Sequence, residues 1–178
     1  TTRYITLLGI AFGMKYLYTQ KIIHRDLKPE NILMDNNFYP FICDFGLSKK
    51  TDKDLKEYQM NSGVGTKYYM APEILAGKKY NYKVDVYSFS IVAAEIISNT
   101  QKNFDESLTY FTNQESKDFI IQCHSFEPKE RPTFYKICKY IVSNCFIQNF
   151  SNISLEEVFE YMELFEESDS DVIFFHSL

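Results

Sequence analysis

The sequence predicts one mainly α-helical domain of the α+β class, with a few short strands near its N-terminus. Apolar residues recur at helical spacing, or form strongly apolar helical runs, over four segments: residues 3–18, 85–98, 115–124 and 133–143. Short apolar runs, bounded by polar and turn-forming residues, lie at residues 22–23, 31–34 and 41–43. The chain has 178 residues, 45% of them hydrophobic and 17% aromatic, which is enough to fill one sizeable core.

The N-terminal elements frame a polar loop. In the first predicted helix the apolar positions include Ile5, Leu8, Phe12 and Leu17. The short runs that follow are predicted strands, and one of them ends directly before Asp44. Because these strands alternate with the polar loop, we expect Asp26, Asn31 and Asp44 to meet at one edge.

Three motifs in chain order carry chemistry: His24-Arg25-Asp26-Leu27-Lys28-Pro29-Glu30-Asn31, Asp44-Phe45-Gly46 and Ala71-Pro72-Glu73. Asp26 is a carboxylate that can accept the proton of a hydroxyl, and Lys28 is a compact cation suited to a transferring phosphate. Asn31 and Asp44 offer oxygen ligands to Mg²⁺, which keeps much of its water shell and needs few protein ligands. A lone Asp in a loop is usually a turn or capping residue, but the three motifs together predict phosphoryl transfer.

On these motifs, residues 1–143 resemble the eukaryotic-type protein kinases of the serine/threonine type. The resemblance implies a largely helical structure: the large C-terminal lobe of the protein-kinase-like fold over residues 1–145, without the N-terminal β-lobe. It also implies transfer of the γ-phosphoryl group of ATP to Ser or Thr hydroxyls of a protein substrate in signal transduction. ATP and Mg²⁺ are the implied cofactors.

The resemblance assigns positions in the active site. The residues that it places at the nucleotide are Lys28, Glu30, Asn31, Leu33 and Asp44. It also implies that Thr66 hydrogen-bonds toward the base Asp26 and toward Lys28. Lys28 and Thr66 together favour a Ser/Thr acceptor, while Thr66 as a turn or cap hydroxyl is the alternative.

Other residues are implied to support the site. His24 and Phe45 would form part of an internal stack. Asp85 would hydrogen-bond the backbone of the catalytic loop, although it can also act as a charge at a helix N-terminus. Arg131 would pair with Glu73, and removal of one partner would strand the other buried charge at about 3–5 kcal/mol.

Regulation is expected to act through Arg25, because a guanidinium next to the catalytic Asp can hold a phosphate on the activation segment. Ser62 is the predicted phosphate acceptor, with Thr51 as a weaker candidate. A solvated loop serine beside Gly63 is an equally weighted interpretation of Ser62. If phosphorylation at Ser62 activates, Ser62→Ala should lower the rate.

Two departures from the family pattern limit what this chain is expected to do alone. The chain starts inside the helix before the catalytic loop, without a Gly-rich phosphate cover or the lysine strand, so we expect negligible turnover from these residues. The stretch 99–113 is too short for the usual docking connection. The alternative function is therefore a catalytically inactive kinase-like binding or scaffold protein, or a gene remnant.

Charge and composition divide the chain. All 19 basic residues lie at or before Lys139, so residues 1–139 carry a net +3 and the overall −5 belongs to the acidic tail, residues 146–178.

No basic stripe indicates nucleic acid, no apolar run is long enough for a membrane, and the four cysteines have no metal spacing. A cytoplasmic protein with reduced thiols is expected.

The acidic tail is predicted to contain a helix. Ser154 and Glu157 form a capping box, and the residues expected to share one apolar face are Leu155, Val158, Phe159 and Met162. We expect this helix to pack on the lobe or to stand as a solvated acidic face. Docking of a partner by the acidic tail helix is the alternative.

Overall fold

The computed structural model describes residues 1–50, 67–101 and 103–166, and it confirms the mainly helical fold class. The longer helices are α1 (Thr2–Thr19), α3 (Lys83–Ser98), α5 (Gln114–Cys123), α6 (Phe134–Ile141) and α8 (Leu155–Glu166). The shorter helices are α2 (Pro72–Leu75), α4 (Phe104–Ser107) and α7 (Asn144–Ile147). The strands are β1 (Ile22–Ile23), β2 (Ile32–Met34), β3 (Pro40–Ile42) and β4 (Lys49–Lys50). Within the described ranges, no helix has the length and apolar character needed to cross a membrane.

The helix boundaries agree with the sequence prediction to within two residues. Offsets of two residues occur at the start of α3, which begins at Lys83 instead of Asp85, and at the end of α6, which ends at Ile141 instead of residue 143. Asn81 explains the earlier start, because its side-chain oxygen accepts a hydrogen bond from the backbone N–H of Lys83 at 2.9 Å. This bond satisfies a donor at the helix end that has no partner inside the helix.

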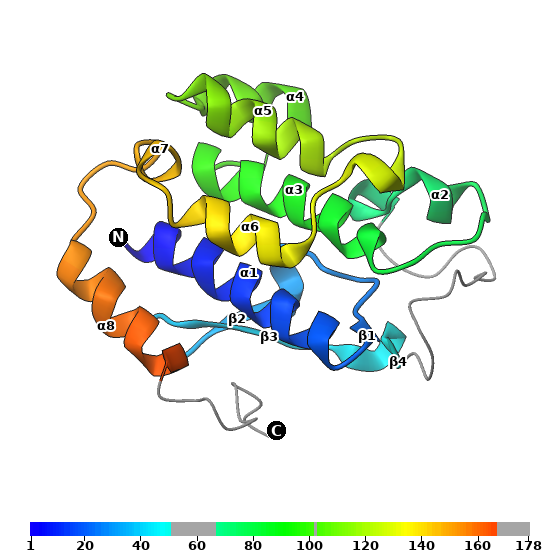
Figure 1. The fold of residues 1–178 in the computed structure, drawn as a ribbon, viewed down its shortest axis with the longest axis horizontal. Coiled ribbons are helices and arrows are strands. Elements are labelled where there is room, and N and C mark those ends of the chain that lie inside the picture. The colour runs from blue at the N-terminus through cyan, green and yellow to red at the C-terminus, as the bar shows by residue number, and fades with distance from the viewer. Residues whose placement is uncertain (51–66, 102, 167–178) are drawn as a thin grey trace.

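The core lies between α1, α3 and α6. Helix α1 packs against α3, α6 and β3, and α5 covers α3 on the side away from α1 (Figure 1). Leu8, Phe89 and Ile137, from α1, α3 and α6, are fully buried. A helix that is apolar on nearly every side is buried on nearly every side, and both α1 and α3 have this character.

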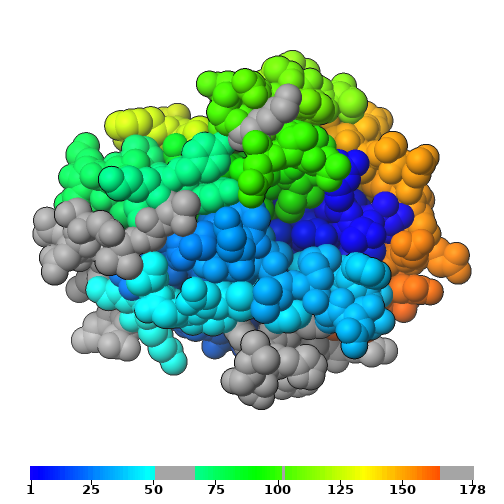
Figure 2. Space-filling view, turned by 180° about the vertical axis from the view of Figure 1, so that it is seen from behind, coloured from blue at the N-terminus to red at the C-terminus, as the bar shows by residue number. Residues whose placement is uncertain are grey.

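The strands form small antiparallel pairs that hold the polar loop. Strands β2 and β3 pair with Ile32 opposite Ile42, and β1 and β4 pair with Ile23 opposite Lys49. Figure 2 shows the segments of β2 and β3 in blue and cyan across the face opposite to that of Figure 1. The two pairs therefore fix both ends of the loop 24–31 and the segment that leads to Asp44.

His124 joins three helices at the end of α5. Its ring stacks between Tyr87 and Phe104, with ring centroids 4.1 Å and 3.7 Å away, and its Nδ1 lies 2.9 Å from the hydroxyl of Ser90. Burial, and then the charge of Arg131, lower the pKa of His124 to about 4. The short connection after α3 thus contains a helix, α4, whose Phe104 closes this stack.

Helix α8 packs on the lobe as expected, but only part of the predicted apolar face is buried. Val158 and Tyr161 are almost completely buried, whereas Leu155 and Phe159 are 54% and 61% exposed. Of the four residues expected to share one apolar face, Val158 is therefore buried and Met162 partly buried, while Leu155 and Phe159 are exposed. Partner docking by this helix stays a prediction.

The capping box of α8 is half formed. The Ser154 hydroxyl accepts a hydrogen bond from the Glu157 N–H at 3.3 Å. The Ser154 N–H, which a full capping box would direct to the Glu157 side chain, instead donates to the hydroxyl of Thr1 at 2.9 Å. The start of α8 is thereby tied to the start of α1.

Gly9 permits the close approach of α8 to α1. A Cβ atom at Gly9 would overlap both the hydroxyl oxygen of Tyr161 and the ring atom Cγ of Pro40. At Gly13, one turn further along α1, the nearest atom would be the flexible end of Ile42, at 3.0 Å. Only the first glycine is thus required by a rigid neighbour.

We predict that Gly9→Ala lowers the free energy of unfolding by about 1–3 kcal/mol, because the methyl group overpacks the contact between α1 and α8. Gly13→Ala is the matched control, and it should change stability by no more than about 1 kcal/mol, since it gains helix propensity and meets a movable side chain. Urea unfolding followed by circular dichroism measures both. Wild-type stability in Gly9→Ala would contradict the described packing.

Candidate active site

The loop 24–31 is held by one buried carboxylate from α3. Asp85 is 1% exposed, and its two oxygens accept hydrogen bonds from the backbone N–H groups of His24 and Arg25, both at 2.8 Å. Burial raises the pKa of the Asp85 carboxyl, and the nearby His24 and Arg25 oppose that shift. The carboxylate thus connects the most buried helix to the loop.

This anchor stabilises a strained backbone. Arg25 has a positive φ of 70°, in the left-handed region that a residue with a Cβ rarely adopts. Such a conformation costs about 1–3 kcal/mol and persists where the surroundings fix it. The hydrogen bond from Arg25 N–H to Asp85 lies at the strained residue itself. The strain is therefore offset at the point where the chain turns into Asp26.

His24 links the loop to the segment that carries Asp44. Its Nδ1 accepts from the Asp26 N–H at 3.3 Å, so the ring proton lies on Nε2, which is 3.1 Å from the carbonyl oxygen of Cys43. The His24 ring also meets Phe45 edge to face, with centroids 5.2 Å apart. A fully buried imidazole therefore fixes the spacing between the two motifs.

Asp26, Lys28 and Asn31 form a compact polar cluster. The Asn31 amide nitrogen donates to the Asp26 carbonyl at 2.7 Å and to its carboxylate Oδ2 at 3.0 Å. The Lys28 ammonium lies 3.0 Å from the same Oδ2. Asp26 is 9% exposed, so the carboxylate is oriented by its neighbours while one edge stays open to solvent.

Asp44 lies beside this cluster. The N–H of Cys43 donates to the Asn31 carbonyl at 2.9 Å, which sets the following residue next to Asn31. Asp44 has a φ of 60° and is exposed, and its Oδ1 accepts from the Gly46 N–H at 3.2 Å.

These oxygens fit a magnesium ion. The Asn31 nitrogen is used by Asp26, so the amide oxygen is the atom left to face a cation. An amide oxygen and an exposed carboxylate are hard ligands of the kind that Mg²⁺ prefers. Within the described residues there is no cluster of three His, Cys, Asp or Glu side chains that could hold a metal, so a dedicated all-protein cage is absent there.

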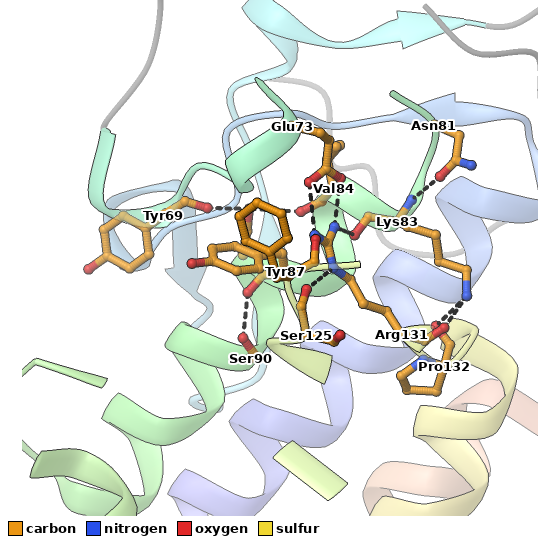
Figure 3. A network of polar contacts seen from close by, with 12 residues as sticks. Tyr69, Glu73, Asn81, Lys83, Val84, Tyr87, Ser90, Ser125, Arg131 and Pro132 are labelled. Carbon is orange, nitrogen blue, oxygen red and sulfur yellow. Dashed lines mark hydrogen bonds and ion pairs between the residues drawn. The ribbon is translucent and has the colours of Figure 1, made fainter. Parts of the chain in front are cut away.

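Glu73 and Arg131 form a buried, bidentate ion pair. The two guanidinium nitrogens Nη1 and Nη2 lie 2.7 Å and 2.8 Å from the Glu73 oxygens (Figure 3). Arg131 is 1% exposed and also donates to the carbonyl oxygens of Ser125, Lys83 and Phe126. The pair ties α2 to the loop before α6 and to the start of α3.

The remaining predicted residues are distributed as follows. Glu30 and Leu33 are exposed, next to the Asp26 cluster in the chain. Thr51, Ser62 and Thr66 lie outside the described residues.

Sequence reasoning missed two sets of polar contacts, one at Arg25 and one between Tyr69 and Glu95. The Arg25 guanidinium donates to the Tyr80 hydroxyl at 3.0 Å and to the Ser48 carbonyl at 3.4 Å. The Tyr69 hydroxyl lies 3.1 Å from both oxygens of Glu95. Burial raises the pKa of Glu95, and the Tyr69 hydrogen bond opposes that shift. A lone carboxylate inside the apolar run 91–97 was a signal for Glu95, whereas nothing in the sequence pointed to Tyr80.

Comparison with known proteins identifies the class that this lobe and its site define. A family model described as the protein kinase domain matches residues 4–143, so the chain belongs to the protein kinase family. The helical architecture is that of the C-terminal lobe of the kinase fold.

Named relatives are themselves kinases. The chain is 37% identical over 151 residues to the RGS domain-containing serine/threonine-protein kinase A of Dictyostelium discoideum, covering 76% of the chain and 13% of that protein. It is 35% identical over 165 residues to the rust resistance kinase Lr10 of Triticum aestivum, covering 73% and 26%. It is 33% identical over 149 residues to the serine/threonine-protein kinase dst3 of Dictyostelium discoideum, covering 74% and 26%. The chain therefore spans about a quarter or less of the length of these relatives.

We predict that Asp85→Asn destabilises the fold by about 2–4 kcal/mol, because an amide has one acceptor oxygen and turns an NH₂ group toward a backbone N–H donor. Asp105→Asn is the matched control: Asp105 also lies in the first turn of a helix but is exposed, and its loss should cost less than about 1 kcal/mol. Thermal unfolding compares the two. Equal effects would mean that Asp85 acts only on its helix end.

We predict that Glu73→Gln and Arg131→Met each cost about 3–5 kcal/mol, since each leaves a buried group without its partner. The double variant Glu73→Gln with Arg131→Met should be more stable than the sum of the single losses implies. Recovery will be incomplete, because three backbone carbonyls lose their donor. A double-mutant cycle in urea measures the coupling, and strict additivity would contradict a direct pair.

Proposed function

We propose that the protein containing this chain transfers the γ-phosphoryl group of ATP to Ser or Thr hydroxyls of protein substrates. The observation that carries the proposal is the cluster of Asp26, Lys28 and Asn31. The Lys28 ammonium and the Asn31 amide nitrogen each lie 3.0 Å from the same carboxylate oxygen, Oδ2 of Asp26. Phosphoryl transfer is catalysed mainly by positioning and by charge stabilisation, which such a cluster supplies.

In this proposal each residue has a separate task. Asp26 receives the proton of the acceptor hydroxyl, because its carboxylate is oriented by Asn31 and still open at one edge. Lys28 shares its charge between Asp26 and the transferring phosphate. Asn31 and Asp44 would hold Mg²⁺, which when bound neutralises charge on the phosphate oxygens. Leu33 and Glu30 would lie toward the nucleotide.

The acceptor class is argued from Lys28 and from the relatives. Lys28 stands where Ser/Thr kinases usually have lysine, and its 3.0 Å contact with Asp26 is compatible with that role. Two of the three relatives named above carry serine/threonine specificity in their names. We include Thr66 as an organiser of Asp26 and Lys28 on the family pattern.

We also propose that phosphorylation regulates the site through Arg25. Its guanidinium lies beside Tyr80 and Ser48, near the end of β4, where the chain enters residues 51–66. A phosphate at Ser62, or at Thr51, would meet a cation adjacent to the catalytic loop. A cytoplasmic location is part of the proposal, and the four free cysteines, Cys43, Cys123, Cys138 and Cys145, support it.

The test is Asp26→Asn in the complete protein that contains this chain. We predict that kcat for phosphate transfer to a general protein substrate falls by about 10²–10⁴, because the variant keeps the shape of the side chain and loses the base. The measurement is the steady-state rate of ³²P transfer from ATP at saturating ATP and protein substrate.

Asp118→Asn is the control, since Asp118 is exposed on α5, away from the site. It should retain the full rate. If the wild-type protein shows no transfer, or if Asp26→Asn transfers as fast as the wild type, the enzyme proposal fails and the scaffold alternative replaces it.

A further inference from the structure

A cavity lies apart from the catalytic loop. It has a volume of about 460 Å³ and is lined by the start of α3, by α5 and by residues 129–136. No residue of the segment 24–31 and no Asp44 lines it. Its volume is in the range of small-ligand sites. We call it the lysine pocket, after the three lysines that line it: Lys83, Lys129 and Lys136.

The charge of the lysine pocket is positive, although the whole chain is acidic at −5. Three lysines face it, against one carboxylate, Glu130. None of these lysines forms an ion pair in the part of the chain that the structure describes, where the recorded pairs are Lys28–Asp26 and Arg131–Glu73. The repulsion among the cations is therefore not balanced by protein carboxylates in that part.

Lys83 is held in position at the wall of the lysine pocket. Its ammonium donates to the carbonyl oxygens of Arg131 and Pro132, the second at 3.2 Å (Figure 3). These bonds use two of its three N–H donors and leave one for a ligand. Burial, and then the charges of Arg131 and Lys136, lower the pKa of Lys83. An anion beside Lys83 would favour the charged ammonium and so oppose this shift.

The helix that closes the lysine pocket adds a favourable field. Helix α6 begins at Phe134, and its N-cap Thr133 is a lining residue. The N-terminus of a helix presents backbone N–H groups and a partial positive charge, so it attracts anions. Arg131 also lines the lysine pocket, but its guanidinium is already paired with Glu73.

We propose that the lysine pocket binds a phosphoryl group, as the dianion of a phosphorylated Ser or Thr side chain or as free phosphate. Lys83 would supply a fixed donor, Lys129 and Lys136 would supply movable ones, and a phosphate oxygen would face the start of α6. The site would serve for recognition, since no group that could transfer phosphate lines it.

The experiment is a chemical-shift titration of the ¹⁵N-labelled chain with sodium phosphate, at constant ionic strength set by sodium chloride. We expect saturable shifts at residues 129–136 and at Lys83. The double variant Lys129→Gln with Lys136→Gln should weaken binding at least about tenfold, equivalent to about 1.4 kcal/mol. Both lysines are exposed, so the variant should fold, and its thermal unfolding checks this.

The matched control is Lys139→Gln, which removes one charge from an exposed position of the same helix α6 outside the lysine pocket. It should bind within twofold of the wild type. Equal weakening in Lys139→Gln and in the pocket variant, or linear shifts without saturation, would overturn the site.

A second arm compares a short peptide that carries one phosphoserine with its unphosphorylated form. If the phosphopeptide binds more tightly than inorganic phosphate, and the unphosphorylated peptide does not bind, the ligand is a phosphorylated side chain. If the phosphopeptide binds no more tightly than inorganic phosphate, the ligand is the free anion. Absence of binding for both phosphate and phosphopeptide would refute the proposal. Because the readout is binding, the result is independent of phosphoryl transfer by Asp26.

Discussion

The two hydrogen bonds that Asp85 accepts from the backbone of His24 and Arg25 are the constraint on which the site depends. They carry the rigidity of a buried helix into a loop that has little regular structure of its own. The loop needs this support, because Arg25 adopts a left-handed conformation that costs free energy. With Arg25 held, Asp26 and Asn31 follow in fixed geometry, so the position of the Asp26 carboxylate is determined by a second carboxylate inside the core.

The Glu73–Arg131 pair has a comparable role at a distance from the chemistry. Burying two charges is costly, and an apolar pair of similar size is often at least as stable. Here the guanidinium also satisfies three backbone carbonyls, from Ser125, Lys83 and Phe126. One planar group therefore sets the relative positions of α2, α3 and the loop before α6, which an aliphatic side chain cannot do. Conformational specificity explains the pair better than stability does.

Much of the site was predictable, and the reason is local. Asp26, Lys28 and Asn31 lie within six consecutive residues, so a motif alone brings them near one another, and the strand that ends before Asp44 places it at the same edge. The packing of α8 was not predictable to the same degree. Tyr161 is buried against Gly9 and Pro40, which are more than one hundred residues away in the chain, and helical periodicity holds no information about such a contact.

The sequence by itself determined the helices, the order of the motifs and the family, because periodicity and motif spacing depend on neighbours along the chain. The tertiary structure alone decided which face of α8 is buried, which hydroxyl meets Arg25, and which lysines line one cavity. Lys83 and Lys136 are separated by more than fifty residues, and the lysine pocket exists because α3 and α6 pack around one core. Such groupings result from the way the buried surfaces fit together.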